Sequence, residues 1–459
     1  MTLGAKHIPP TTTGAYPLRD GNYVRPLVDG GPAFRRICEA VEAAHHSVWV
    51  TVAFIDRDVQ MPDGRGSFFD VIDKATARGL DVRLLFWRFE PHGSPRTAEA
   101  TFWGDESERA WLSGRGSRFL ARWDHNPGYC HHQKSWLIDA GQAGETAFVG
   151  GINLHTNSVV APGHPYIEGQ LGSTHDVYVE LQGPIATDVR HNFIQRWNEA
   201  TERGHDHGVW QVPGDLPFPT EISPDKGEVS VQITRTVRQG AYSDSTPPPG
   251  GQPHPIAEGD GSMLEQYVAA IDASRESIYF ENQGIGSPVI IAHIEEALKR
   301  GVNVTFLVPG RPPLPMTAAR RDPGSAAFFQ QLARLGQYDS FLLAGIAGNI
   351  APGRYHDIYV HAKVALIDDT WATIGSTNVA NRSFHRDTEL NASFWHPETV
   401  RALRAELLQE HVGIDTSNLG VVDAMRTYKE VARANTTRRA LGEPLEGLAH
   451  EIDPAGYGL

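Results

Sequence analysis

Two stretches of the chain place a histidine and a lysine two residues apart beside an otherwise apolar run. Residues 131–153 read HHQKSWLIDAGQAGETAFVGGIN, and residues 359–378 read YVHAKVALIDDTWATIGSTN. Because side chains on a strand alternate between its two faces, we expect the histidine and the lysine of each stretch on the same face. Burying an imidazole and an ammonium is costly unless an anion meets them. The repeated pattern therefore predicts an anion held between the two stretches.

Each stretch supplies the same set of polar groups. These are a histidine, a lysine, an aspartate that ends the strand and an asparagine after a glycine: His132, Lys134, Asp139 and Asn153, and then His361, Lys363, Asp368 and Asn378. By parity the two aspartates lie on the opposite face from the histidines and lysines, and we interpret them as turn or structural anchors rather than proton carriers. The asparagine amides can donate hydrogen bonds to an oxyanion.

Two imidazoles, two ammoniums and two amides suit the chemistry of a phosphodiester. The lysines and asparagines can hold the nonbridging oxygens and balance charge in the transition state. One neutral histidine can attack phosphorus, and the other, protonated, can give a proton to the departing alcohol. We expect no metal and no cofactor, because the motifs lack acidic clusters and each lysine would repel a cation. A single His-x-Lys pair is more often a surface feature without a catalytic role, but two matched copies favour catalysis.

The elements that must position these groups also occur twice. Residues 46–56 (HSVWVTVAFID) and 77–87 (ARGLDVRLLFW) are matched by residues 276–286 (ESIYFENQGIG) and 299–309 (KRGVNVTFLVP). Helix-like runs with apolar residues at helical spacing precede and follow each series. Nearly continuous apolar strands that alternate with helices indicate sheets covered on both faces. The sequence therefore predicts a duplicated α/β protein with two lobes.

The boundary between the lobes is expected in residues 204–228, which are rich in proline, glycine and charge. We place the first lobe at residues 1–215, with its motif at 132–139. The second lobe is placed at residues 216–459, with its motif at 361–368 and a helical C-terminal tail. Residues 239–261 form a long loop-like stretch, which is either a functional or mobile segment or a plain surface insertion.

The bulk composition limits the classes of partner. The 459 residues carry a net charge of −14, which argues weakly against a protein that grips a nucleic acid backbone. The N-terminus has no apolar signal core, and the longest apolar runs are strand-sized. We expect a cytoplasmic protein and leave open an export route that needs no cleaved signal. The two cysteines, Cys38 and Cys130, indicate neither a disulfide framework nor a zinc motif.

The doubled pattern His-x-Lys-x4-Asp followed by Gly-(Gly/Ser)-x-Asn resembles the phospholipase D superfamily over most of the chain. The segments HHQK, FVGGIN, HDVYVELQGP, YFENQGIG, YVHAKVALIDD and GSTN are similar to phosphatidylcholine-type enzymes of the plant and other eukaryotic kind. The resemblance implies an α/β fold with two duplicated lobes, each a mixed β-sheet flanked by helices, and an active site at the lobe interface. The chain departs from the pattern by an insertion, GQAGE, which we expect to lengthen a hairpin turn away from the site.

The resemblance also implies roles for the motif residues. His132 corresponds to the nucleophile of the family, and His361 to its acid and then base. The two lysines and the two asparagines would bind the phosphoryl oxygens. The family orients each histidine with a carboxylate that follows the motif, so we expect Asp176 to orient His132 and Glu389 to orient His361. Asp387 shares a strand face with Glu389 and is its rival.

Several residues near the motifs are not assigned to the chemistry. Glu281 and Asn282 end a central strand of the second lobe, and they are either structural or in contact with substrate. His131, His155 and His175 are interpreted as structural histidines with satisfied hydrogen bonds.

The leading hypothesis is a phospholipase D that hydrolyses phosphatidylcholine or phosphatidylethanolamine to phosphatidate and the free head-group alcohol through a phosphohistidine. A primary alcohol in place of water would give transphosphatidylation. The alternatives are a phosphatidyltransferase of the cardiolipin synthase type, a nuclease of the same family, and a silent binding protein. The expected partners are phospholipid at a membrane surface, approached peripherally, and water or an alcohol, with no nucleic acid; we expect a monomer. Two histidines in opposite protonation states predict a bell-shaped pH profile.

Overall fold

The structure is a computed structural model of the chain. It describes residues 7–88, 106–116, 118–125, 128–170, 172–202 and 214–459. The first part of the predicted boundary segment, residues 204–213, lies outside the described residues. The division into lobes at residues 215 and 216 therefore stays a prediction.

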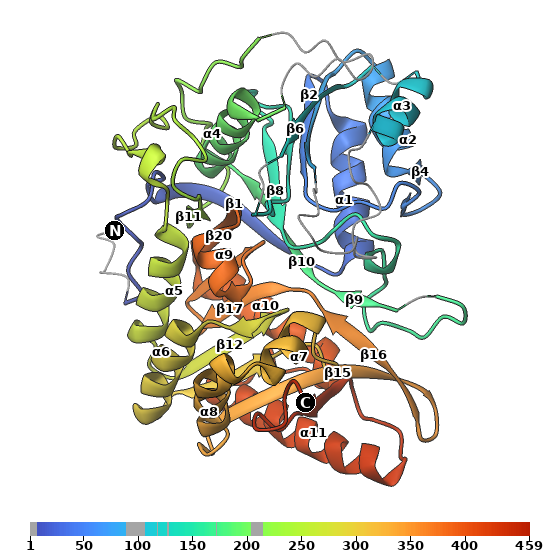
Figure 1. Ribbon diagram of the computed structural model, residues 1–459, viewed down its shortest axis with the longest axis vertical. Helices are drawn as coiled ribbons and strands as arrows, with labels where there is room; N and C mark the ends of the chain where they lie inside the picture. The colour runs from blue at the N-terminus through green and yellow to red at the C-terminus, as the bar shows by residue number, and fades with distance from the viewer. Residues whose placement is uncertain (1–6, 89–105, 117, 126–127, 171, 203–213) are drawn as a thin grey trace.

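The first half of the chain forms a mixed sheet with the strand order β1-β10-β8-β7-β2-β5-β6. The strands are β1 (Arg19–Val28), β2 (Ser47–Val52), β5 (Asp81–Trp87), β6 (Leu120–Asp124), β7 (Ser135–Ile138), β8 (Thr146–Gly150) and β10 (Val177–Gln182). Strands β2, β5 and β6 are parallel, and the other pairings are antiparallel. Helices α1 (Gly30–Ala43) and α2 (Phe68–Ala77) pack on one face, and α4 (Pro184–Glu199) packs on the other. Helix α3 (Glu106–Gly114) lies beside α2 (Figure 1).

The second half repeats this arrangement with the order β11-β20-β18-β17-β12-β14-β15. Its strands are β11 (Val229–Thr236), β12 (Ser277–Asn282), β14 (Asn303–Leu307), β15 (Phe341–Ala351), β17 (Lys363–Ile367), β18 (Trp371–Gly375) and β20 (Glu389–Trp395). Helices α5 (Ser262–Ala273), α6 (Pro288–Lys299) and α8 (Ala326–Leu335) pack on one face, and α10 (Pro397–Val412) and α11 (Val421–Leu441) on the other. The predicted fold class, a duplicated α/β protein with mixed sheets flanked by helices, is confirmed.

Shorter elements complete the fold. They are β3 (Gln60–Met61), β4 (Gly66–Ser67), β9 (Thr174–His175), β13 (Ile285–Gly286), β16 (Arg354–Val360), β19 (Val379–Ala380), β21 (Ala449–Glu451), α7 (Leu314–Arg321) and α9 (Asn381–His385). The stretch 239–261 is irregular apart from one 3-10 turn, and its backbone accepts hydrogen bonds from His191 and Gln195 of α4. No helix within the described ranges is both long and apolar enough to cross a membrane.

Two strand pairings join the halves. Strand β1 pairs with β11, and β9 pairs in parallel with β16, so that 17 of the described strands form one sheet, while β3 with β4 and β13 with β19 form two small separate sheets. A single apolar cluster draws residues from both halves and lies between α4, α10, α11 and the inner sheet faces. Figure 1 shows the two halves stacked along the long axis, with the blue and green strands above and the yellow and orange strands below.

The strands are nearly continuous in apolar residues because both of their faces are buried. On β7, Leu137 joins the central cluster, whereas Trp136 and Ile138 join the cluster under α1 and α2. On β17, Leu366 joins the central cluster and Ala365 joins the one under α5 and α6. The two motif strands are therefore fixed from both sides, which makes them rigid supports for the residues at their ends.

Candidate active site

A cavity of about 360 Å³ brings the two histidine stretches together. His132 and His361 both line it, although they come from different halves of the chain. Its other lining residues are Phe54, Asn153, His155, Asn157, Ser158, Thr174, Gln283 and Tyr359. Each of the two histidine side chains keeps 9% of its surface exposed, which leaves one edge of each ring open to the cavity.

Backbone pairing across the halves sets the position of each histidine. The N–H of His132 donates to the carbonyl of Thr388 (3.0 Å), and the N–H of Thr388 donates to the carbonyl of Cys130 (2.9 Å). In the same way, the N–H of His361 donates to the carbonyl of His175 (2.8 Å). Each motif histidine is thus tied to the segment that follows the other motif, and not to the one that follows its own.

The carboxylates that contact the histidines follow this crossed arrangement. Nδ1 of His132 lies 3.0 Å and 3.1 Å from the two carboxylate oxygens of Glu389. Nδ1 of His361 lies 2.5 Å from Oδ2 of Asp176. The pairing expected from the sequence, Asp176 with His132 and Glu389 with His361, is therefore wrong, because it assumed that each half is self-contained.

Asp387, the rival of Glu389, contacts neither histidine in the described part of the chain. One of its oxygens accepts the backbone N–H of Cys130 (2.8 Å), and the other accepts Nε of Arg382 (2.7 Å). Its contact with Cys130 helps to hold the backbone two residues before His132. Asp387 is therefore a support of the histidine segment and does not orient an imidazole.

The carboxylates determine which ring nitrogen faces the cavity. A carboxylate accepts hydrogen bonds, so Nδ1 of each ring is the donor and a neutral ring carries its lone pair on Nε2. Neither Nε2 atom of His132 and His361 has a hydrogen-bond partner among the described residues. The hydroxyl of Ser376 donates to Glu389 (2.5 Å), whereas the matching residue of the first half, Gly151, has no hydroxyl to offer Asp176. The carboxylate that contacts His132 thus accepts an additional hydrogen bond from a hydroxyl group, which the carboxylate that contacts His361 does not receive from the matching position.

Burial lowers the pKa of both motif histidines. It lowers the pKa of His132 to about 4, against the opposing charge of Glu389, and Lys134 lowers it further. It also holds the pKa of His361 well below its usual range, with Lys363 and Lys134 acting in the same direction. Both imidazoles are therefore neutral at pH 7 when no anion is present.

The two lysines are buried beside the histidines. Nζ of Lys134 donates to the carbonyl of His132 (2.7 Å), and Nζ of Lys363 donates to that of His361. Burial lowers the pKa of Lys134 to about 8 and that of Lys363 to about 7. An anion in the cavity would raise the pKa of all four basic groups, because it favours their charged forms. The site is thus built to gain stability from a bound anion.

The asparagines leave part of their hydrogen-bonding capacity unused. Asn153 follows β8 and Asn378 follows β18, and Asn153 lines the cavity. The side-chain oxygen of each is buried and has no hydrogen-bond partner among the residues that the structure describes. Rotation of a carboxamide exchanges its oxygen with its NH₂, so each group can turn a donor toward a bound oxyanion.

The motif aspartates are placed at the far ends of their strands. The carboxylate of Asp139 accepts the backbone N–H groups of residues 45, 46 and 47, and that of Asp368 accepts those of residues 275, 276 and 277. Both residues have φ near +53°, where aspartate is tolerated better than most residues. Each carboxylate thus fixes the entry to the central strand of its half, β2 or β12.

Some cavity residues were not found by sequence reasoning. Phe54 and Gln283 lie just beyond the C-terminal ends of β2 and β12, where ligands of open α/β sheets usually bind, so this position was the available signal. His155, which we interpreted as a structural histidine, also lines the cavity. Glu281 and Asn282 are fully buried; Glu281 forms a hydrogen bond with His175, and the amide of Asn282 donates to the carbonyl of Thr377.

His131 is buried beside the histidine that faces the cavity. Its Nδ1 lies 3.1 Å from the hydroxyl of Thr388, which belongs to the other half of the chain. Burial lowers the pKa of His131 to about 4, so this ring is neutral. The placement agrees with the structural role that the sequence suggested.

A duplicated α/β fold that brings one His-x-Lys pair from each half to a single cavity is the arrangement expected of the phospholipase D class. Comparison with known families agrees with this assignment. Residues 267–410 match the family described as "Cardiolipin synthase, PLD-like domain", and residues 168–303 match the family described as "Phospholipase D". The chain carries domains of the phospholipase D superfamily.

Among curated proteins, the chain is similar to bacterial cardiolipin synthases, and these similarities do not specifically support the plant-type resemblance that its motifs suggested. It is 25% identical to cardiolipin synthase A of Pseudomonas putida, over 82% of this chain and 66% of that protein. It is 24% identical to cardiolipin synthase 1 of Staphylococcus epidermidis, over 84% of this chain and 67% of that protein. The chain thus spans about two thirds of the length of these relatives.

A solved structure supports the fold. The crystal structure of phosphatidylserine synthase from Haemophilus influenzae matches 92% of this chain and 95% of its own, with a TM-score of 0.55 and 12% sequence identity. A likeness at this level of identity concerns the fold alone.

Proposed function

We propose that this chain is a phosphatidyltransferase that moves a phosphatidyl group from one glycerophospholipid to the hydroxyl group of an acceptor, such as the glycerol head group of a second phospholipid. The observation that carries the proposal is the shared cavity in which Nε2 of His132 and Nε2 of His361 are both free to meet one phosphoryl group. The similarity to cardiolipin synthases supports transfer between lipids as the form of the reaction.

In the first half-reaction, Nε2 of His132 attacks phosphorus while the bond from phosphorus to the head-group oxygen breaks. His361 gives its Nε2 proton to that oxygen, and the head-group alcohol leaves. His361 must therefore be protonated in the complex, and the anionic phosphodiester favours this form. The Asp176 carboxylate accepts a hydrogen bond from Nδ1–H of His361 and stabilises the imidazolium before the transfer.

In the second half-reaction, the acceptor hydroxyl gives its proton to Nε2 of the now neutral His361 and attacks phosphorus. The bond from phosphorus to Nε2 of His132 breaks, and both histidines return to their starting states. Water in place of the acceptor would release phosphatidate. Glu389 holds Nδ1 of His132 and stabilises the positive charge that the ring gains in the phosphohistidine.

The remaining polar groups of the site hold the phosphoryl oxygens in this proposal. The ammoniums of Lys134 and Lys363 and the amides of Asn153 and Asn378 meet the nonbridging oxygens, where negative charge is greatest in the transition state. The lipid is drawn from a membrane surface by a peripheral encounter.

Hydrolysis of phosphatidylcholine or phosphatidylethanolamine, our first expectation from the sequence, is the same reaction with water as the acceptor. The relatives support transfer instead, which was our second expectation. A nuclease would need a basic groove, and the net charge of −14 does not favour one.

The test supplies vesicles of phosphatidylglycerol, vesicles of phosphatidylcholine with ethanol, and single-stranded DNA in three separate reactions, and resolves the products by mass spectrometry. We expect cardiolipin and free glycerol from the first mixture, and loss of both products in His132→Ala and His361→Ala. Phosphatidate alone from both lipid mixtures would replace transfer by hydrolysis. Cleavage of single-stranded DNA with both lipids untouched would overturn the proposal.

A further inference from the structure

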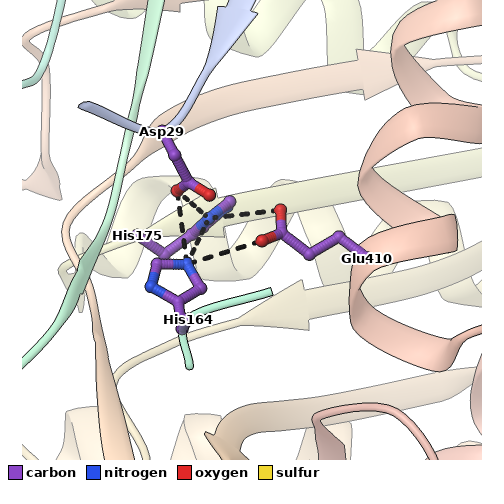
Figure 2. A group of neighbouring side chains, drawn as sticks. All are labelled: Asp29, His164, His175 and Glu410. Atoms are coloured by element: carbon purple, nitrogen blue, oxygen red, sulfur yellow. Dashed lines mark hydrogen bonds and ion pairs between the residues drawn. The ribbon is translucent and has the colours of Figure 1, made fainter. Parts of the chain in front are cut away.

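A second group of polar side chains is buried behind the cavity. It consists of Asp29, between β1 and α1; His164, in the loop before β9; His175, in β9; and Glu410, in α10. The side chains of Asp29, His164 and His175 are 0% exposed and that of Glu410 is 7% exposed. Figure 2 shows that the four side chains converge from different elements on one point.

The distances between the facing atoms are short and similar. Nδ1 of His175 lies 2.9 Å from Oδ1 of Asp29 and 3.4 Å from Nε2 of His164. Nε2 of His164 lies 3.2 Å from the same Asp29 oxygen. The Glu410 oxygens complete the group, at 3.6 Å from His164 Nε2 and 3.8 Å from His175 Nδ1.

We propose that these four residues form a structural zinc site. In a tetrahedral site with bonds of about 2.0–2.1 Å from zinc to nitrogen or oxygen, neighbouring ligand atoms are about 3.3–3.4 Å apart. The five observed distances, between 2.9 and 3.8 Å, scatter around this value. Four protein ligands and deep burial are typical of closed structural sites, not of catalytic ones that keep a position open.

The outer partners of the ligands orient them as metal ligands are usually oriented. His164 directs its other nitrogen, Nδ1, at the hydroxyl of Ser173 (2.7 Å). His175 directs its Nε2 at a carboxylate oxygen of Glu281 (3.0 Å). Glu410 accepts the backbone N–H of Gly163 (2.6 Å). With these partners each imidazole can donate outward, which would turn the lone pair of its inner nitrogen toward the common point.

A hydrogen-bonded network without metal explains the group less well. Oδ2 of Asp29 is buried and has no hydrogen-bond partner within the described ranges, which is costly for a carboxylate oxygen. Nε2 of His164 and Nδ1 of His175 face each other and also face Oδ1 of Asp29. Only one proton can lie between the two nitrogens. A divalent cation at the common point would bind the inner nitrogens of both histidines and Oδ1 of Asp29 at once, and the two carboxylates would neutralise its charge.

The ligand types select zinc over other abundant cations. Calcium and magnesium prefer all-oxygen sites with six or more ligands, whereas two imidazoles and two carboxylates in tetrahedral array suit zinc. No local sequence motif indicates the site, because its four residues lie far apart in the sequence, at positions 29, 164, 175 and 410.

The site would join the two halves of the chain next to His361. Asp29 and the two histidines come from the first half, and Glu410 comes from the second. His175 precedes Asp176, whose carboxylate holds Nδ1 of His361, and the carbonyl of His175 accepts the N–H of His361. A zinc ion here would fix the segment that positions this histidine. This inference does not depend on the proposed function.

The test measures the metal content of the full chain, purified from cells supplied with zinc, by elemental mass spectrometry. We expect about one zinc ion per chain in the wild type, and less than about a tenth of that in His164→Ala and Glu410→Gln. His293→Ala is the matched control, because His293 also pairs with a carboxylate, that of Asp272 (2.6 Å), but on the surface. This variant is expected to keep the full content.

Cobalt replacement in the wild type keeps the test independent of whether the variants fold. Zinc is removed with a chelator and Co²⁺ is added, and the visible absorption is recorded. We expect the strong bands of tetrahedral Co²⁺ and a rise in the melting temperature of about 5 °C or more on adding either metal to the stripped protein. The proposal would be overturned if the wild type takes up neither metal, or if His164→Ala holds as much zinc as the wild type. Either result would leave a hydrogen-bonded network without metal.

Discussion

The crossed contact between Glu389 and His132 provides the sharpest test of the site geometry. In the variant Glu389→Gln, the side chain keeps its size but loses its negative charge. In the wild type, the carboxylate accepts a hydrogen bond from Nδ1–H of His132, with 3.0 Å between nitrogen and oxygen. If each half were self-contained, this change would disturb His361 instead. Because the contacts cross between the halves, we expect the disturbance at His132 alone.

The magnitude follows from the nature of the bond. A buried hydrogen bond to a charged group contributes about 1.5–3 kcal/mol. Glu389 is fully buried and stabilises the positive charge that His132 gains on attacking phosphorus, so most of this energy is lost from the transition state. At about 1.4 kcal/mol for each factor of ten, phosphoenzyme formation should slow by about 10- to 100-fold.

Two measurements check this result. Rapid quenching with a lipid labelled on its phosphate measures phosphoenzyme formation, and ¹⁵N NMR of labelled histidine reports the tautomer of each ring. We expect Glu389→Gln to change the His132 signals and leave those of His361 in place, with the reverse in Asp176→Asn. Asp387→Asn is the control and should alter neither tautomer, since Asp387 contacts Cys130 and Arg382. A shift of His361 in Glu389→Gln would refute the crossed arrangement.

Three further predictions concern the supports of the site. In Asp368→Asn, asparagine tolerates the left-handed backbone, but the charge that accepts three backbone N–H groups is lost. The free energy of unfolding, measured in denaturant, should therefore fall by about 2–3 kcal/mol, and an unchanged value would contradict the anchoring role. Burial lowers the pKa of Lys363 to about 7 and that of Lys134 to about 8, and anion binding requires the charged form of both lysines. Affinity for an unreactive phosphonate lipid should therefore weaken as the pH rises above about 7, and more steeply above about 8, with proton uptake in calorimetry, whereas flat affinity would deny the lysines a role. In Gly151→Ser, the new Cβ would lie 2.4 Å from a carboxylate oxygen of Asp176 and displace that carboxylate. Transfer activity should fall at least about tenfold while the protein stays folded, and normal activity would show that the position of this carboxylate does not matter.

The sequence was sufficient to predict the fold class and the two histidines that meet in the cavity. The duplicated apolar strands predicted two similar sheets, because a strand buried on both faces has few alternatives to apolar side chains. The placement of His132 and Lys134 at the end of one such strand, and of His361 and Lys363 at the end of its copy, predicted a buried site for an anion. The fold class and the burial of these four residues are confirmed, because strand periodicity and the cost of burying charge are local properties, whereas the anion stays a prediction.

The residues that support the site could not be predicted in the same way. Asp176 and Glu389 were recognised as partners of histidines, but each was assigned to the histidine of its own half. Nothing in the local sequence records that β9 pairs with β16 or that His131 pairs with Thr388. Such pairings depend on the energy of the whole fold, in which many distant segments compete for the same partner.

The sequence by itself determined which side chains could do the chemistry and that they occur in two matched sets. Only the tertiary structure decided that the sets are exchanged across the halves, so that the partner of each histidine lies more than a hundred residues away. It also decided that Asp29, His164, His175 and Glu410 converge on one buried point. The physical reason is that a side chain's chemical type is fixed by covalent structure, whereas its neighbours are chosen by cooperative packing of the entire chain.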